Sequence, residues 1–433
     1  MKRRSSSYLS FLTAIGALML GACGDDTGTA PTYDASLSET GSSPSADASA
    51  SAIDGSAGLP SGIVVLSSDY QSSSVSILDR DGNLVKDNCF NSNTGPKGIS
   101  LTLSGDLALP TQTTFGDTVV ILDRTNSVLT WLDAATCTPL RQLAVGTGFV
   151  SNPHDYVALS PTKAYVVRFS ENAAATPAPD DFDDGNDLLI IDPTQPKIVG
   201  RIDLTPFAPA GVLPDADRAM LIDGKVYVSL NAISDNWKTY GAGRVVIVDP
   251  ALDQVVGTID LPGVKNCGAL TYLPAEKRLL VACTGDFGAG AQQFQSSAIV
   301  AIDVSTTPPT VVGQVGAATV GTVAFANTAI AAFDSNTILG VELGDFSNTP
   351  PDKVWTISLA GAQPTKLFDS TEGITIGTML VDSARARVFI ADGTKKSVGL
   401  IREFDLVAGS LTAGKTTAAN PSHSLPPRAL AWY

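Results

Sequence analysis

Short apolar segments that end in aspartate recur along this chain at nearly constant intervals. They are Ser76–Asp79, Thr130–Asp133, Leu189–Asp192, Ile247–Asp249, Ala301–Asp303 and Glu403–Asp405, and Trp355–Ser358 fills the remaining position with serine at its end. Successive segments lie 54, 59, 57, 54, 55 and 47 residues apart. This period is the length of a four-stranded antiparallel sheet with its turns, so the sequence predicts seven such units.

The segments around each aspartate also recur in order. A strand such as Lys225–Ser229 precedes the aspartate-ended strand, and a last strand such as Val255–Leu261 follows it. These runs are rich in Val, Ile and Leu, which is typical of strands buried on both faces. No stretch of 11 residues after residue 60 has helical spacing. In the second unit, Val120–Asp123 and Thr130–Asp133 both qualify as the aspartate-ended strand.

Repeated four-stranded units of this length predict radial blades, an arrangement that leaves only short sheet edges exposed. The Val226-Tyr227-Val228 strand, the Asp192-Pro193 and Asp249-Pro250 turns and the Thr258–Leu261 strand resemble the YVTN-type repeats of seven-bladed propellers. These propellers are related to the quinoprotein amine dehydrogenase β-chain-like superfamily. The resemblance covers residues 61–433 and implies an all-β, seven-bladed β-propeller with four-stranded blades, of which the sixth has drifted most.

The two ends of the repeating region predict ring closure. Ile63–Leu66 has the pattern of a second strand, and Pro427–Tyr433 has that of a first strand. A blade shared between them would remove the open edge. We expect the recurring aspartates to hold their own turns by accepting backbone N–H groups, rather than to act in catalysis.

The N-terminus has the pattern of an export signal. Lys2, Arg3 and Arg4 precede an apolar run that ends at Ala22. Leu20–Cys23 resembles the lipobox of bacterial lipoproteins, which implies cleavage of residues 1–22 and lipidation of Cys23 with palmitate and related chains. The alternative is an ordinary secretory signal that contains a cysteine.

Residues 23–60 combine the lipidated cysteine with a linker rich in Ser, Ala, Gly and Asp, and residues 61–433 form the propeller. A linker of this composition is predicted to act as a flexible tether. Gly24 follows Cys23 where aspartate is the usual inner-membrane retention signal of enteric bacteria. By that resemblance, we expect anchoring in the outer membrane, with a periplasmic or a surface-exposed propeller.

Charge and cysteine content restrict the partners and the compartment. The formal net charge is −15, and loss of the three cationic residues of the signal would make it −18. Such a charge repels phosphate backbones, so we expect no nucleic-acid partner. Four cysteines remain after Cys23, and an even number in an exported protein favours two disulfides.

We favour a Cys267–Cys283 disulfide because a turn at Pro274–Lys277 would bring the two residues opposite each other. Cys89 and Cys137 would form the second pair. The alternative is four buried free thiols. The cysteine and histidine spacings do not match a zinc site.

The candidate binding residues fall where loops and first strands would meet on one propeller face. Long insertions at about residues 170–186, 231–243, 284–297 and 344–352 are predicted there. The channel mouth on that face would carry Lys97, His154, Asp155, Arg218 and Arg428, with His423 just before the last. These residues could hold an anionic ligand. Alternatively, they pair with neighbouring aspartates and fix the channel mouth.

An acidic loop offers a candidate calcium site. Its ligands would be Asp180, Asp181, Asp183, Asp184 and Asp187 around Gly185. Phe182 occupies a ligand position of the calcium-binding loop of EF-hand proteins, so the spacing does not match that motif. The alternative is a solvated acidic loop, and no other cofactor is predicted.

The motifs of common catalytic sites do not occur. The chain has only two histidines and neither a Gly-x-Ser-x-Gly nor a His-Glu-x-x-His sequence. We therefore expect a non-catalytic binding or scaffold module for a protein, a glycan or a small anion. The alternative is a propeller enzyme, a lactonase or an oxidoreductase subunit, with its site at the mouth of the central channel. That alternative is an analogy with similar propellers.

Overall fold

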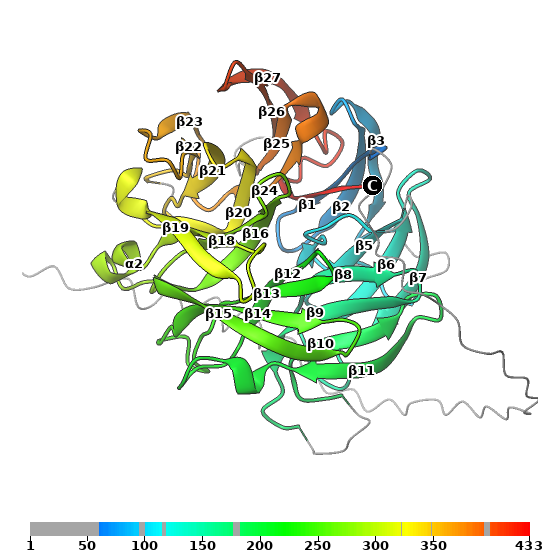
Figure 1. Ribbon diagram of the computed structural model, residues 1–433. Coiled ribbons are helices and arrows are strands. Elements are labelled where there is room, and N and C mark those ends of the chain that lie inside the picture. Colours follow the sequence, from blue (N-terminus) through cyan, green and yellow to red (C-terminus); the bar gives the residue numbers. More distant parts are fainter. Residues whose placement is uncertain are drawn as a thin grey trace, which may run out of the picture. The chain divides into compact units, whose positions relative to one another are not determined.

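Seven antiparallel sheets of four strands each are arranged in a ring (Figure 1). The computed structural model describes residues 60–94, 100–114, 118–175, 182–321, 323–347, 349–393 and 399–433. The predicted seven-bladed, all-β propeller is confirmed. Helical structure in the described residues is limited to α2 (Ala291–Gln295) and the 3-10 turns η1 (Thr205–Phe207), η2 (Ala317–Thr319) and η3 (Ser383–Arg385).

The blades are numbered in chain order, and their strands are given from the centre outward. Blade 1 contains β28 (Pro427–Trp432), β1 (Gly62–Ser68), β2 (Ser73–Asp79) and β3 (Leu84–Asn91). Blade 2 contains β4 (Leu107–Ala108), β5 (Thr118–Asp123), β6 (Val128–Asp133) and β7 (Thr138–Ala144). Blade 3 contains β8 (Pro153–Ser160), β9 (Lys163–Glu171), β10 (Gly185–Asp192) and β11 (Lys197–Asp203). Blade 4 contains β12 (Ala216–Ile222), β13 (Lys225–Leu230), β14 (Ala242–Asp249) and β15 (Gln254–Lys265).

The remaining blades follow the same order around the ring. Blade 5 contains β16 (Cys267–Leu273), β17 (Arg278–Cys283), β18 (Ala298–Asp303) and β19 (Thr310–Gly316). Blade 6 contains β20 (Phe325–Asp334), β21 (Thr337–Glu342), β22 (Lys353–Ile357) and β23 (Thr365–Asp369). Blade 7 contains β24 (Ile376–Asp382), β25 (Arg387–Asp392), β26 (Leu400–Val407) and β27 (Ser410–Ala418). In blade 2, both candidate segments are strands, and Thr130–Asp133 lies in the third strand like the other aspartate-ended segments.

The apolar core is divided among the contacts between neighbouring blades. Middle strands such as β9 and β14 are almost wholly buried, whereas the outer strand β11 alternates between exposed and partly buried residues. In the described residues, seven large clusters each combine side chains from two adjacent blades, and a smaller eighth cluster lies beneath the β13–β14 loop. Each blade is therefore stabilised by both of its neighbours, and closure of the ring supplies the seventh contact.

The predicted closure joins the two ends of the described chain. β28 pairs with β1, with Val65 opposite Leu430. Leu430 is 2 % exposed and packs in the cluster between blades 7 and 1. The C-terminal strand therefore completes the blade that the N-terminal strands begin.

Five of the six recurring aspartates hold the turns that follow them, as predicted, and Asp405 instead accepts a hydrogen bond from Arg387 at 3.0 Å. The Asp192 carboxylate accepts hydrogen bonds from the backbone N–H of Thr194 (2.9 Å) and from the Thr194 hydroxyl. Asp303 accepts the N–H of Ser305 in the same way, at 2.9 Å. In blade 6, the Ser358 hydroxyl accepts the N–H of Ala360 at 3.1 Å and replaces the aspartate. These carboxylates are structural.

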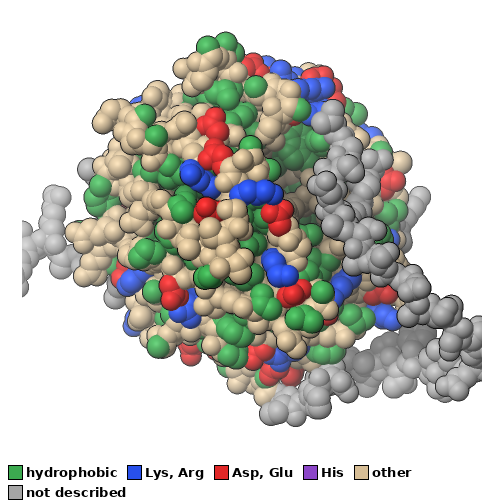
Figure 2. Space-filling view, viewed as in Figure 1, with side chains coloured by type: hydrophobic (Ala, Val, Ile, Leu, Met, Phe, Trp, Pro, Cys, Tyr) green, Lys and Arg blue, Asp and Glu red, His purple; other side chains and the backbone are tan. Residues whose placement is uncertain are grey.

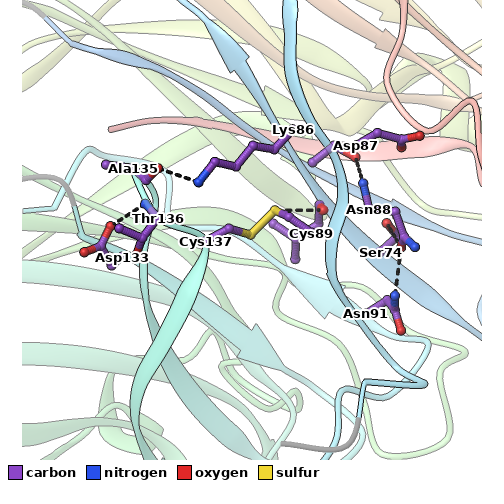
Figure 3. Close-up of a disulfide and its surroundings, with 12 residues drawn as sticks. Ser74, Lys86, Asp87, Asn88, Cys89, Asn91, Asp133, Ala135, Thr136 and Cys137 are labelled. Carbon is purple, nitrogen blue, oxygen red and sulfur yellow. Dashed lines mark hydrogen bonds between the residues drawn. A yellow bond between two sulfur atoms is a disulfide. The ribbon is translucent and has the colours of Figure 1, made fainter. Parts of the chain in front are cut away.

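Both favoured disulfides are present. Cys267 lies directly opposite Cys283 in the β16–β17 pair, as the turn between these strands predicted. Cys89 on β3 is bonded to Cys137 in the turn before β7, and this bond joins blade 1 to blade 2 (Figure 3). Lys86 reinforces the same contact by donating to the carbonyl of Ala135 at 2.6 Å.

Two faces of the propeller are distinguished by strand direction. We call the end at which the first strands begin the loop face, because the connections between second and third strands also lie there. These connections include the long β9–β10, β13–β14, β17–β18 and β21–β22 loops. The opposite end, which carries the short turns between third and fourth strands, is the turn face.

Candidate functional site

A buried histidine and aspartate pair lies at the centre of the loop face. His154 and Asp217 stand near the starts of β8 and β12, and His154 Nδ1 lies 2.8 Å from Asp217 Oδ1. Asn231 Nδ2 donates to the other carboxylate oxygen at 3.2 Å. Burial lowers the pKa of His154, while the hydrogen bond to Asp217 and the charge of Asp217 act in the opposite direction. Burial alone would raise the pKa of Asp217, but the bond from His154 and nearby charges lower it to about 2.

An aromatic stack connects this pair to the surface. The His154 ring lies 4.3 Å from the ring of Phe169, with 18° between their planes. Phe169 in turn stacks on Trp237 at 6.0 Å and 23°. Trp237 belongs to the β13–β14 loop and is 58 % exposed. The stack therefore leads from the channel mouth to a solvent-exposed indole.

Asp155, the neighbour of His154, connects three blades. Its carboxylate accepts the N–H and the hydroxyl of Thr111 from blade 2, at 2.9 and 2.6 Å. It also accepts the N–H of Ala219 from blade 4, at 2.9 Å. Burial raises the pKa of Asp155. The positive charge of Arg218 and these hydrogen bonds act in the opposite direction, but their effect on the pKa is smaller than that of burial. With these partners and no exposed surface, Asp155 stabilises the packing around the channel.

The cationic candidates that are described have partners within the fold. Arg218 donates to the carbonyl of His154 at 3.0 Å, and its Nε lies 3.6 Å from Asp217. Arg428, on the other side of the ring in blade 1, donates to the carbonyl of Ser68 at 3.1 Å and lies over the ring of Tyr70. The structure therefore brings His154, Asp155 and Arg218 into contact, and it places Arg428 at the start of the innermost strand of blade 1, the position that His154 occupies in blade 3.

Two further cationic candidates are Lys97 and His423. Lys97 lies outside the described residues. His423 is in an exposed loop, where its ring lies 2.8 Å from the hydroxyl of Ser422. Basic and acidic side chains are interspersed on the face seen in Figure 2. Anion binding at the channel mouth remains a prediction. The described cations contact groups of the fold itself, which is what the alternative of a structural role for these residues predicts.

The acidic loop uses its described carboxylates in ion pairs. Asp187 is fully buried and receives two hydrogen bonds from Arg168, both at 2.7 Å. Asp184 pairs with Arg201. Asp183 is described, whereas Asp180 and Asp181 lie outside the described residues. Among the residues that the structure describes, no group of three or more His, Cys, Asp or Glu side chains could hold a metal ion.

Three carboxylates gather beneath the β13–β14 loop. Asp215 is 6 % exposed and accepts the N–H of Ile233 at 3.0 Å. Burial raises its pKa to about 7, and the nearby charges of Glu171 and Asp235 act in the same direction. Burial also raises the pKa of Glu171, together with the charge of Asp235. The negative charge near Trp237 therefore increases with pH in the neutral range.

The exposed aromatic residues all lie on one face. In the described part of the chain, Tyr70, Trp237 and Phe346 are the aromatic side chains that are strongly exposed, at 62, 58 and 55 %. Each lies in a connection between second and third strands, on the loop face. Sequence reasoning placed these loops but did not single out Trp237. The feature of the sequence that could have identified Trp237 as an exposed residue is its position within the polar segment Ser234–Thr239.

A shallow hollow lies on the loop face of blades 4 and 5. It has a volume of about 370 Å³ and is lined by Gly263, Lys265, Asp286, Gln292, Gln295 and Ser296. A second hollow of about 430 Å³ contains Glu276, Arg278 and Ser335, which bond to one another. Both volumes lie within the range of small-ligand sites.

Searches of protein-family models and of curated proteins found no match to this chain. Among solved structures, a putative 6-phosphogluconolactonase from Bacteroides fragilis aligns with a TM-score of 0.56 at 11 % identity, over 86 % of this chain and 98 % of that one. A similarly named protein from Bacteroides uniformis aligns with a TM-score of 0.55 at 10 % identity, over 86 and 100 %. Hydrazine synthase of Kuenenia stuttgartiensis aligns with a TM-score of 0.52 at 11 % identity, over 85 and 99 %. At these identities the likeness shows the fold alone.

Proposed function

We propose that this protein is a lipid-anchored, extracytoplasmic propeller that binds a ligand on its loop face without transforming it. The observation that carries the proposal is the separation of two features to opposite faces. The chain joins the propeller on the turn face, whereas the long loops and the exposed aromatic residues lie on the loop face. Each part of this separation follows from described contacts.

The attachment side is defined by residues at the start of β1. Ser61 donates to the carbonyl of Tyr433 at 2.6 Å, and Gly62 pairs with Asp79. Asp79 and Tyr433 end strands that run from the loop face to the turn face. The described chain therefore enters the propeller on the turn face. The loop face is then left available to a ligand, either in the periplasm or at the outer surface of the outer membrane.

The binding role also agrees with how the central groups are used. Asp155 has four hydrogen-bond donors, counting the N–H of Tyr156, and Arg218 donates to backbone carbonyls. A catalytic acid or nucleophile needs a free atom that can reach substrate. Asp155 and Arg218 instead bond to groups of the fold, which favours a rigid scaffold that presents its loops. No helix among the described residues has the length and apolar character needed to cross a membrane.

Detergent partitioning and site-specific photo-crosslinking in whole cells test the two parts of the proposal. The wild-type chain should enter the detergent phase, and Cys23→Ser should remain in the aqueous phase. A photoreactive residue at Trp237 should yield crosslinked products that are absent when it replaces Val199. Val199 is a fair control because it is 52 % exposed but lies on the outer strand β11. Equal partitioning, or equal products from both positions, would contradict the proposal.

A second candidate is a propeller enzyme such as a lactonase, and the His154–Asp217 pair is the observation that favours it. A histidine oriented by a carboxylate is the arrangement of a general base. This candidate predicts hydrolysis of simple lactones by the purified chain and its loss in His154→Gln. Bound metal in the purified chain, lost in the same variant, would also favour the enzyme. An inactive chain without metal would favour the binding module.

A further inference from the structure

We propose that the loop face of blades 3 to 5 binds a neutral polysaccharide, with Trp237 as its stacking platform and Gln292 and Gln295 as hydrogen-bonding groups. This inference rests on the proposed binding function and specifies its ligand. Sugar rings present an apolar C–H face and a rim of hydroxyl groups. A site for them therefore needs an exposed aromatic ring beside uncharged donors and acceptors.

Trp237 has the properties of such a platform. Its indole is held from below by the ring of Phe169. Its loop is fixed by short-range bonds, including the Trp237 N–H to the carbonyl of Ser234 at 2.7 Å and the Thr239 N–H to the hydroxyl of Ser234 at 3.0 Å. A bridge between Ile233 and Tyr240 closes the loop at its base. Because the ring is already positioned, binding would lose little conformational entropy at this residue.

Phe287 links the hollow to the cluster that supports the Trp237 loop. Phe287 packs against the cluster of Phe169, Ile233 and Tyr240 on which the indole stacks. The next residue along the chain toward the N-terminus, Asp286, lines the hollow. The platform and the hollow therefore share one supporting cluster. A chain of several sugar rings could contact both, whereas a single ring could not fill both.

The hollow provides uncharged hydrogen-bonding groups. The side-chain amides of Gln292 and Gln295 line it and bond to no other described residue, whereas Gln293 between them accepts the N–H of Gly288 at 3.0 Å. Each free amide offers two N–H donors and one carbonyl acceptor. Hydroxyl groups of a sugar both donate and accept, so they match this combination.

The charges at the site disfavour an anionic ligand. Lys265 is the basic residue that lines the hollow, and it is paired with Asp286 at 3.0 Å. Glu171, Asp215 and Asp235 place further carboxylates near the Trp237 loop. An acidic polymer would be repelled by these groups. A protein partner is disfavoured because the centre of a stable protein interface is apolar, whereas this hollow is lined by polar side chains.

Affinity electrophoresis of the purified propeller tests the proposal. The gel would contain a soluble neutral polysaccharide, either a β-glucan, a galactomannan or a xylan, with the acidic polymers alginate and polygalacturonate as comparisons. We expect at least one neutral polymer to retard the wild-type protein and neither acidic polymer to do so. Trp237→Ala should weaken binding about tenfold, the scale of a lost aromatic contact. Gln292→Ala with Gln295→Ala should also weaken it.

Phe346→Ala is the matched control, because Phe346 is 55 % exposed on the same face but lies in blade 6. Its retardation should equal that of the wild type, and the melting temperatures of all variants should agree because the altered side chains are exposed or partly exposed. Absence of retardation in every neutral polymer overturns the proposal, as does equal binding by the Trp237→Ala variant. Failure of the wider binding function is recognised by a different result. In that case, the photoreactive residue at position 237 gives the same products as the one at position 199.

Discussion

Arg168 and Asp187 form a bidentate ion pair in which neither side chain is exposed to solvent. Arg168 Nε and one of its terminal nitrogens each lie 2.7 Å from a carboxylate oxygen of Asp187. The other terminal nitrogen donates to the Thr147 hydroxyl at 2.7 Å. The pair joins two strands of blade 3 to the segment that leads into this blade, at the base of the acidic loop.

Removal of one partner should strongly destabilise the propeller. Arg168→Met leaves a buried carboxylate without its main counter-charge, and we expect the free energy of unfolding to fall by about 3–5 kcal/mol. The double variant Arg168→Met, Asp187→Leu should recover much of this loss because no buried charge remains. Urea denaturation of the single and double variants measures both effects. Lys366→Met, which breaks the exposed pair with Asp369, should leave the midpoint unchanged.

Truncation of the C-terminal strand should destabilise every blade. Deletion of Arg428–Tyr433 removes the partner of β1 and the buried residues Ala429, Leu430 and Ala431. We expect the melting temperature to fall sharply or cooperative unfolding to be lost. The milder Leu430→Ala should cost about 2–5 kcal/mol, whereas Leu252→Ala at an exposed turn should change little. An unchanged melting temperature after truncation would contradict a shared blade.

Asp215 makes stability depend on pH near neutrality. Its folded pKa of about 7 lies above its ordinary value of 3.8, so the folded state keeps a proton that the unfolded state has lost. Stability should therefore fall as pH rises from about 4 to 7. Asp215→Asn keeps an acceptor for the Ile233 N–H and tolerates the positive φ of 43° at this position.

Relative to wild type, this variant should be more stable at pH 8 by up to roughly 4 kcal/mol, and the difference should shrink toward pH 4. Asp235→Asn should give a smaller effect in the same direction, because it removes only one of the charges near Asp215. Denaturation curves between pH 4 and 8 measure the difference. If the gain in the free energy of unfolding of Asp215→Asn does not depend on pH, the pKa of Asp215 is not raised in the folded state.

The two disulfides should differ in their contribution to stability. They close segments of 48 and 16 residues, for which the chain-entropy relation gives about 4 and about 3 kcal/mol. Replacement of Cys89 and Cys137 by serine should therefore destabilise the protein more than replacement of Cys267 and Cys283. Hydrogen exchange should rise in blades 1 and 2 for the first variant and in blade 5 for the second. The opposite order of melting temperatures would contradict the relation.

Much of the fold could be predicted because each blade repeats a local pattern. The aspartate at position 192 or 303 ends a strand and holds a turn through atoms two residues away, so its role depends on nearby sequence alone. The same holds for the Cys267–Cys283 pair, since a short turn between adjacent strands fixes which residues face each other. Closure by β28 was also predictable. The first segment of the repeating region has the pattern of a second strand and the last segment that of a first strand, so each supplies the strand that the other lacks.

The candidate site was predicted only in part, because its contacts join blades that are distant in sequence. His154 was singled out, but its partner Asp217 is 63 residues away and lies on another blade. For Arg218 and Asp155 the sequence left a ligand role and a structural role open, and it could not show that carbonyls and N–H groups from three blades surround them. Asp187 was a candidate calcium ligand because acidic residues surround it in the sequence. In the structure, Asp187 lies on β10 opposite Arg168 on β9, and the two form an ion pair.

The number of blades, the turns and the Cys267–Cys283 pair could be predicted from the sequence, because they depend on periodicity and on residues close along the chain, and Cys89 and Cys137 were then the two cysteines left to pair. Which charges are neutralised and which aromatic ring is exposed became evident only in the folded ring. The physical reason is that burial and ion pairing depend on what the neighbouring blade supplies, and that neighbour is fixed only when the ring closes.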